Sequence, residues 1–214
     1  MLALFDLDGT LSRRDTLFSY AKGYVRGHPS RILRLPGVLP TLLRYASGGA
    51  DRGQLKSDFL RAVFADHTRA EVEAWTARFV PQLVQHGLFA DALAALAAHR
   101  GRGDYPVLLS ASPDLYVPAL ASALGFAEAI CTGIAWRGER FDGALTTANR
   151  RGPEKARCLA ELRIRHPGLA IVAYGNAASD LEHLVLADQA LLVNGNRRAR
   201  LAATRAGIGC VTWR

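Results

Sequence analysis

The stretch Leu2-Ala-Leu-Phe-Asp-Leu-Asp-Gly-Thr-Leu11 decides how the rest of this 214-residue chain is interpreted. Its first four residues are apolar, which is the pattern of a strand buried on both faces, as in a parallel sheet. Asp6 and Asp8 follow directly, and carboxylates are costly inside a core unless they are paired or bind a metal. The strand is therefore expected to end at the carboxyl edge of an open α/β sheet, where such folds hold their ligands.

Two carboxylates one residue apart can divide a reaction between them, because one can attack while the other handles a proton or a metal. A carboxylate is a recognised acceptor of phosphoryl groups. Gly9 lets the backbone approach a ligand closely, and Thr10 adds a hydroxyl. An isolated Asp-x-Asp would more often be an acidic turn, but the complete motif after an apolar strand favours phosphoryl chemistry.

The composition limits the partners. The formal net charge is +8, and arginine supplies nearly all of it, because the only lysines are Lys22, Lys56 and Lys155. The arginines are scattered rather than clustered with aromatic residues, so a nucleic-acid partner is not expected. The charge suits an anionic substrate or an anionic membrane surface equally well.

The cysteine pattern and the hydropathy indicate a cytoplasmic protein. The 3 cysteines have no C-x-x-C spacing, which suggests a reducing compartment without a disulfide framework or a zinc site. The N-terminus lacks a basic region, and Asp6 and Asp8 interrupt its apolar run, so it is not expected to be a signal peptide. No uncharged apolar stretch is long enough for a transmembrane helix.

Residues 12–86 have helical patterns throughout. Asp15 is placed to cap a helix whose apolar face includes Leu17, Tyr20 and Tyr24, although it could instead face a substrate. Two further helices are expected at about 52–65 and 69–86. The apolar face of the first is marked by Leu55, Phe59, Ala62 and Val63, and that of the second by Val72, Trp75, Phe79 and Leu83.

Residues 31–45 are the most apolar part of this segment. Pro36-Gly37 and Pro40 interrupt it, so one continuous helix is not expected. Arginines at 31, 34 and 44 flank the apolar residues, as in segments that lie on a membrane interface. The alternative is a helix packed inside a helical cap domain.

The second half of the chain alternates buried strands with helices. Strands are expected at 106–110, 170–174, 189–193 and 209–213, with a hairpin turning near Gly138. Ser110 stands at the end of the first of these strands, where it could simply be the serine that starts a helix. Lys155 stands in the first turn of a helix opened by Pro153, and a cation there opposes the helix dipole, which hints at a function.

The motif Phe5-Asp-Leu-Asp-Gly-Thr-Leu11 resembles the first motif of the haloacid dehalogenase superfamily of phosphatases and phosphotransferases. The resemblance implies that Asp6 is the nucleophile that forms an aspartyl-phosphate and that Asp8 is the general acid and base. Mg²⁺ is implied as the cofactor beside them.

The remaining motifs of that superfamily fall in the same order along the chain. Ser110 matches the second motif, whose hydroxyl contacts the phosphoryl oxygens together with the backbone around Ala111 and Ser112; Thr10 belongs to the same implied substrate site. Lys155 matches the third motif, which offsets the charge of the nucleophile and the phosphoryl group. Gly175-Asn-Ala-Ala-Ser-Asp180 resembles the fourth motif, which commonly reads G-D-x-x-x-D. The implied metal ligands are Asp6, Asp8, Asn176 and Asp180.

The subgroup most similar to this pattern contains phosphoserine-phosphatase-like and phosphatidylglycerophosphatase-C-like proteins. It implies a Rossmann-like parallel sheet formed by residues 1–11 and 87–214, with a helical cap formed by residues 12–86 after the first strand. In this subgroup an acidic residue at the position of Asp15 helps to read the substrate. The departure is Asn176, which replaces a carboxylate of the fourth motif.

The sequence thus predicts a Mg²⁺-dependent phosphatase for a small-molecule or lipid-headgroup phosphomonoester. It leaves open a phosphotransferase of the same family, and a catalytically degenerate binding or membrane-associated protein in which Asn176 has weakened the metal site. Peripheral membrane contact through residues 31–45 is compatible with either activity.

Overall fold

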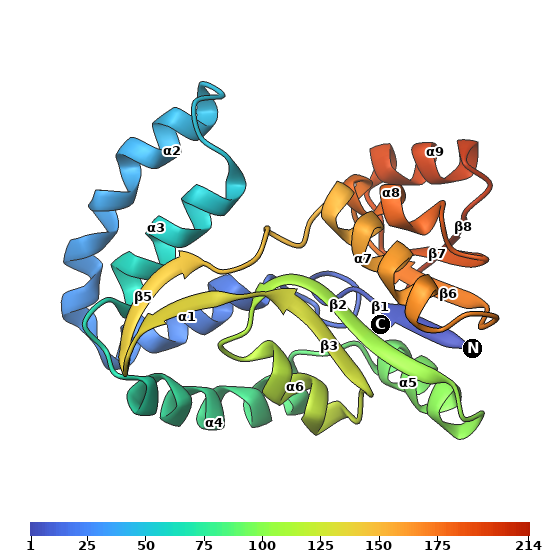
Figure 1. The fold of residues 1–214 in the computed structure, drawn as a ribbon, viewed down its shortest axis with the longest axis horizontal. Helices are drawn as coiled ribbons and strands as arrows, with labels where there is room; N and C mark the ends of the chain where they lie inside the picture. The colour runs from blue at the N-terminus through green and yellow to red at the C-terminus, as the bar shows by residue number, and fades with distance from the viewer.

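The computed structural model describes residues 1–214 and contains a six-stranded, fully parallel sheet (Figure 1). Across the sheet the strands are β3 (Glu128–Thr132), β2 (Tyr105–Pro113), β1 (Leu2–Phe5), β6 (Ile171–Gly175), β7 (Gln189–Val193) and β8 (Gly209–Val211). Phe5 pairs with Leu108 on one side and with Tyr174 on the other. The carboxyl ends of the three central strands therefore lie at the same edge, as expected for the motifs that follow them.

Helices cover both faces of the sheet, which explains why β1 is apolar at every position. Ala3 and Phe5 belong to the cluster on the face covered by α5 (Ala90–Gly101) and α6 (Val117–Leu124). Leu2 and Leu4 belong to the cluster on the opposite face. The helices of that face are α7 (Pro153–Arg165), α8 (Leu181–Leu184) and α9 (Arg197–Arg205) (Figure 1). The predicted α/β fold with a Rossmann-like sheet is confirmed.

Between β1 and β2 the regular elements are all helices. Ahead of α5 they are α1 (Thr16–Gly27), the 3₁₀ segment η1 (Pro29–Val38), α2 (Leu39–Ala46), α3 (Arg52–Phe64) and α4 (Arg69–His86). Figure 1 shows α2 and α3 projecting away from the sheet, whereas α4 packs beside α6. The two helices expected at 52–65 and 69–86 are present within one residue of those bounds. Asp51 and Thr68 cap their first turns and so fix where each helix begins.

The expected hairpin is formed by β4 (Ile134–Arg137) and β5 (Arg140–Leu145). It continues from β3 and lies against α3, where the Ser57 hydroxyl donates to the Gly143 carbonyl at 2.7 Å. The Arg69 amide donates to the Glu139 carbonyl at the hairpin turn. The hairpin was expected within residues 129–146, but the first residues of that range belong to β3, which pairs with β2 and forms the edge strand of the sheet.

One expectation about α3 is wrong. The buried side chains of this helix are Ser57, Leu60, Val63 and Phe64, rather than a stripe through Leu55 and Phe59. The helix is apolar on more than one side, and the hairpin and α1 cover the side that carries Leu60. Leu55 and Phe59 face a cavity instead.

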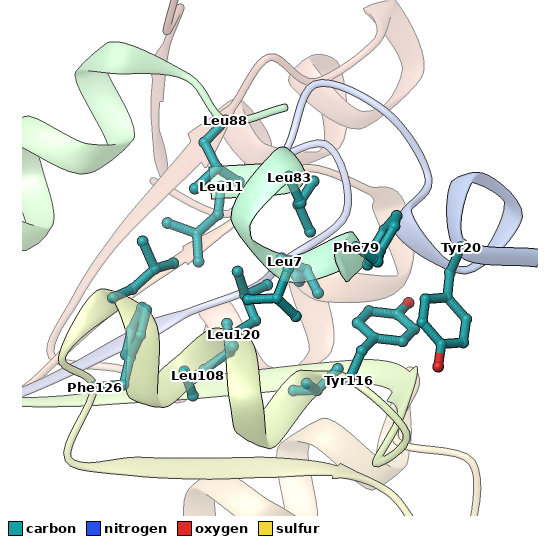
Figure 2. Packing of buried hydrophobic residues seen from close by; sticks show 14 of the residues in the cluster. Leu7, Leu11, Tyr20, Phe79, Leu83, Leu88, Leu108, Tyr116, Leu120 and Phe126 are labelled. Carbon is teal, nitrogen blue, oxygen red and sulfur yellow. The ribbon is translucent and has the colours of Figure 1, made fainter. Parts of the chain in front are cut away.

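The inserted helices and the sheet share one hydrophobic core (Figure 2). Tyr20 of α1 and Phe79 of α4 pack against Tyr116, which precedes α6. Leu7, Leu108 and Leu120 belong to the same cluster of 29 buried residues. Burying each such side chain stabilises the fold by about 1.5–3 kcal/mol, so α1 and α4 are firmly attached to the sheet.

No helix of the structure has both the length and the apolar character needed to span a bilayer. The apolar residues of 31–45 are nevertheless not buried in the protein: η1 has no buried residue, and Thr41 is the one buried residue of α2. The segment packs against α3 on one side, so its exposed apolar residues lie on the other side and the two interpretations of residues 31–45 both stay predictions.

Candidate active site

The turn after β1 brings the first motif to the edge of the sheet. The Asp6 amide donates to the Tyr174 carbonyl at 3.0 Å, which continues the ladder one residue beyond β1. Gly9 has a φ of +82°, and a Cβ atom at this position would lie 1.9 Å from Nδ2 of Asn176. Glycine is therefore required here, both for the backbone conformation and because the Asn176 side chain crosses over it.

Lys155 forms the electrostatic centre of the site. Its Nζ lies 2.5 Å from Oδ1 of Asp6 and 2.8 Å from Oδ1 of Asp180, and all three side chains are buried. The other oxygen of Asp180 accepts hydrogen bonds from the backbone amides of Asn176 and Ala177. Residues from β1, α7 and the loop after β6 thus converge, and the position of Lys155 at a helix start is explained by its two carboxylate partners.

The two carboxylates that share this cation are in different electrostatic states. Burial raises the pKa of Asp6 to about 7, with Lys155 opposing and Asp180 reinforcing the rise. Burial would also raise the pKa of Asp180, but Lys155 and the backbone amide of Ala177 hold it at about 2. Desolvation would lower the pKa of Lys155, but Asp6 and Asp180 raise it above its ordinary value, so Lys155 remains charged.

Asp8 is held from the opposite side of the site. Its Oδ1 accepts hydrogen bonds from the amide and the hydroxyl of Thr16, at 2.6 and 2.7 Å, and its Oδ2 accepts one from the Ser112 hydroxyl at 2.8 Å. Burial and the charge of Asp15 raise the pKa of Asp8, while the hydrogen bonds oppose this. A carboxyl group with a raised pKa is suited to giving and taking a proton near neutral pH.

The predicted hydroxyl groups are present at the same edge. Thr10 donates its hydroxyl to Oδ2 of Asp6 at 2.9 Å, and Ser110 accepts a hydrogen bond from the Ser112 amide at 3.0 Å. Ala111 uses its carbonyl to accept hydrogen bonds from Lys56 and from the Thr132 hydroxyl. Thr10 and Ser110 are fully buried, so each is fixed in position by its partner.

Asp15 is the N-cap of α1, as one of its two interpretations predicted, and a contact with substrate stays a prediction. Its Oδ1 accepts the Phe18 amide at 2.7 Å and so caps α1. It also lines a cavity of about 590 Å³ that lies between the helical insertion and the sheet edge and includes Asp8, Ala111 and Ser112 in its wall.

Two residues of the site, Thr16 and Lys56, were not predicted from the sequence. Thr16 fixes Asp8, but a threonine at the first position of a helix carries no signal of that role. Lys56 of α3 donates to the Ala111 carbonyl at 2.5 Å and to the Asn149 side chain, and burial lowers its pKa to about 8, opposed by Asp8 and Asp15. Its rarity, as one of 3 lysines, was the one available signal.

The oxygen atoms near Asp6 fit a hard divalent cation. No hydrogen bond engages the side chain of Asn176 or the backbone carbonyl of Asp8, so both oxygens are free to coordinate. Together with the carboxylates of Asp6 and Asp180 they form an all-oxygen donor set, which Mg²⁺ prefers. No group of three or more His, Cys, Asp or Glu side chains is arranged for a metal, so the amide and the carbonyl would be essential to such a site.

The comparison with known proteins identifies the family. The family model for haloacid dehalogenase-like hydrolases matches residues 3–184. Protein CicA of Caulobacter vibrioides is 31% identical over 195 residues, which cover 88% of this chain and 84% of CicA. A probable phosphatase of Mycobacterium tuberculosis is 27% identical over 210 residues, covering 96% of this chain and 72% of that protein. The chain belongs to the haloacid dehalogenase-like hydrolase family.

Solved structures show the same fold. A protein of unknown function from Bordetella pertussis Tohama I superposes with a TM-score of 0.80 at 24% identity, covering 98% of this chain and 97% of that one. A substrate-bound phosphoserine phosphatase superposes with a TM-score of 0.69 at 16% identity, covering 98% and 91%. The chain is thus a phosphatase-like hydrolase with the fold of the phosphoserine phosphatases, and the resemblance inferred from its motifs is confirmed.

Proposed function

We propose that the protein is a Mg²⁺-dependent phosphomonoesterase that works through an aspartyl-phosphate on Asp6. The observation that carries this proposal is the buried cluster in which Lys155 bridges Asp6 and Asp180 at the carboxyl edge of the sheet. An ion pair with only a structural role would not need the free side-chain oxygen of Asn176 and the free backbone carbonyl of Asp8 beside it.

In the first half of the reaction a carboxylate oxygen of Asp6 attacks phosphorus, and the bond between phosphorus and the alcohol oxygen breaks. Asp8 transfers its proton to that oxygen, so the alcohol leaves neutral. Lys155, the Ser110 hydroxyl and the backbone around Ala111 and Ser112 hold the phosphoryl oxygens. Thr10 orients Asp6 through its hydrogen bond to Oδ2.

In the second half Asp8, now a carboxylate, takes a proton from water, and that water attacks the phosphorus of the aspartyl-phosphate. The bond between phosphorus and Asp6 breaks, which releases phosphate and restores both carboxyl groups. When bound by Asp6, the Asp8 carbonyl, Asn176 and Asp180, Mg²⁺ supplies charge that offsets the phosphoryl oxygens.

The helical segment 12–86 acts in this proposal as a cap that shields the aspartyl-phosphate from bulk water. Lys56 supports this role, because its ammonium group joins α3 to the Ala111 carbonyl at the sheet edge. Asp15 is placed at the junction of cap and core, where it would contact the organic part of the substrate.

The test is phosphate release from 4-nitrophenyl phosphate with and without Mg²⁺. Mg²⁺-dependent release by the wild-type protein, and none by Asp6→Asn, supports the proposal. A degenerate site would release no phosphate under either condition. Adding an alcohol as a second acceptor identifies a phosphotransferase, because the alcohol would then be recovered as a phosphate ester.

We also propose peripheral membrane contact through residues 31–45, because Ile32, Leu33 and Leu43 expose 55%, 83% and 62% of their surface beside several arginines. The test is flotation with anionic vesicles. Leu33→Asp is expected to reduce co-migration, whereas Leu201→Asp, at an exposed leucine of α9 outside residues 31–45, should not. Absence of co-migration by the wild-type protein removes this proposal.

A further inference from the structure

The cavity beside Asp8 is walled mainly by apolar side chains. Its apolar wall comes from α1, η1, α2 and α3 and comprises Leu17, Phe18, Val38, Leu42, Leu55 and Phe59. Because Asp8 and Ser112 belong to the same wall, a group placed in this cavity lies beside the reaction centre proposed above.

The apolar wall lies at the margin of the hydrophobic core. Leu17 and Phe59 pack against the core, but neither they nor Leu55 are fully buried. Leu42 keeps 45% of its surface exposed, and Phe18 keeps 61%. Binding of an apolar ligand along this wall removes apolar surface from water, which lowers the free energy of the complex.

The charged groups around the cavity are largely engaged with the protein. Lys56 donates to Ala111 and Asn149, and Arg52 donates to the Tyr45 hydroxyl at 2.8 Å while lying over its ring. Asp15 caps α1. Arg151 is the charged residue of the wall whose side chain has no hydrogen-bond or ion-pair partner. Apart from this cation, the cavity offers apolar contact and few free polar partners for the organic part of a substrate.

A neighbouring cavity provides the contrast. It lies between the start of α3 and the start of α7 and is lined mostly by polar residues, among them Gln54, Ser57, Thr147 and Glu154. Asp8 and Ser112 are absent from its wall. The cavity that meets the reaction centre is thus the apolar one.

We propose that the physiological substrate is a phosphate monoester of an aliphatic alcohol, whose hydrocarbon chain lies along Leu17, Leu42, Leu55 and Phe59. This inference rests on the proposed phosphatase activity and names the chemical class of its leaving group. The chain contributes binding energy in proportion to the apolar surface that it covers, and the cations at the rim suit the phosphate end.

The test is a chain-length series of ethyl, butyl, hexyl and octyl phosphate, used below the concentrations at which they form micelles. The specificity constant kcat/KM is expected to rise by up to about fourfold per methylene buried, the ratio to which 0.8 kcal/mol corresponds. Octyl phosphate should exceed butyl phosphate by roughly tenfold or more. Phosphoserine serves as the polar comparator; if it exceeds octyl phosphate, or if the series is flat, the inference is overturned.

Two neighbouring leucines of α2 provide a matched pair of variants. Leu42 lines the cavity, whereas Leu43 is exposed and does not. Leu42→Asn is expected to reduce the octyl-to-butyl ratio several-fold, and Leu43→Asn should leave that ratio unchanged. Equal ratios in both variants would contradict the placement of the chain.

Binding is measured separately, so that a failure of the phosphatase proposal can be distinguished. Octyl phosphonate, which cannot be hydrolysed at its P–C bond, should raise the Tm of the wild-type protein more than ethyl phosphonate does. If no phosphate ester is hydrolysed but octyl phosphonate still binds better, the proposed reaction is wrong and the apolar site stands. Equal shifts with both phosphonates would remove the site itself. Offering the long-chain ester in phosphatidylcholine vesicles then distinguishes a membrane-borne substrate from a dissolved one.

Discussion

Replacing Asp6 by asparagine is expected to stop turnover and, at the same time, to make the metal-free protein more stable. Asp6 is 6% exposed and shares the single Lys155 cation with Asp180. An asparagine resembles the protonated form of this carboxyl group in size and in lacking charge. Lys155 keeps its ion pair with Asp180, so the substitution leaves no buried charge without a partner.

The magnitude follows from the pKa of Asp6, which burial raises from 3.8 to about 7. Because the folded pKa lies above the unfolded one, the folded state holds a proton between these values that the unfolded state has released. The contribution of Asp6 to the stability of the wild-type protein therefore falls as pH rises through this window, by about 1.36 kcal/mol per pH unit, and is constant above it; the difference between the wild type and Asp6→Asn isolates this contribution from those of other titrating groups. The total is roughly 4 kcal/mol, and Asp6→Asn should gain up to that amount at pH 8.

The assay is urea-induced unfolding, followed by circular dichroism in EDTA at pH 4, 6 and 8. The two proteins should be similar at pH 4 and should diverge as pH rises. Glu73→Gln is the control, since Glu73 is exposed on α4 and makes no hydrogen bond or ion pair. If Asp6→Asn is less stable than the wild type at pH 8, or if both have the same dependence on pH, the electrostatic reasoning is wrong. Retained Mg²⁺-dependent turnover in Asp6→Asn would refute its role as nucleophile.

Three further substitutions have expected outcomes. His183 is 1% exposed, its Nδ1 has no partner, and burial lowers its pKa to about 3. Its contribution to stability should therefore be lost as pH falls below 6.5, by about 2 kcal/mol at pH 5, and relative to the wild type the free energy of unfolding of His183→Leu should rise by that amount between pH 6.5 and pH 5. Asn176→Asp adds a carboxylate to the proposed donor set and should lower the Mg²⁺ concentration for half-maximal activity or Tm shift roughly tenfold, whereas an increase would argue against Asn176 as a ligand. Leu120→Ala should cost 2–5 kcal/mol in urea unfolding because Leu120 is fully buried, while Leu201→Ala, at a residue that is 53% exposed, should stay within about 0.5 kcal/mol.

Most strands of the sheet could be predicted from the sequence because they are short and apolar, and several are followed by motif residues. β1 and β7 were predicted with their observed bounds, and β6 within one residue. β3 was missed as a sheet strand because Glu128 and Cys131 give it no continuous apolar run, and its pairing with β2 is a long-range contact that local pattern does not encode.

The residues proposed to be catalytic came from motifs, whereas the residues that contact them were not predicted. Lys155 stood out because a cation in the first helical turn is locally unfavourable, and its two carboxylate partners supply the compensation. Thr16 and Lys56 are ordinary by local criteria, since their role depends on where α1 and α3 meet the sheet edge. The face of α3 was misassigned because periodicity reports which residues are apolar, not whether protein or a cavity covers them.

The shared core of Figure 2 limits how this enzyme can admit a substrate. Lifting residues 12–86 as a rigid lid would separate Tyr20 and Phe79 from Tyr116 and would break the bonds from Thr16 to Asp8, at a cost close to global unfolding. The elements that contribute least to this core are η1 and α2, which pack against α3 and in which Thr41 is the one buried side chain. Amide hydrogens of η1 and α2 are therefore expected to exchange with solvent sooner than those of α1 and α4.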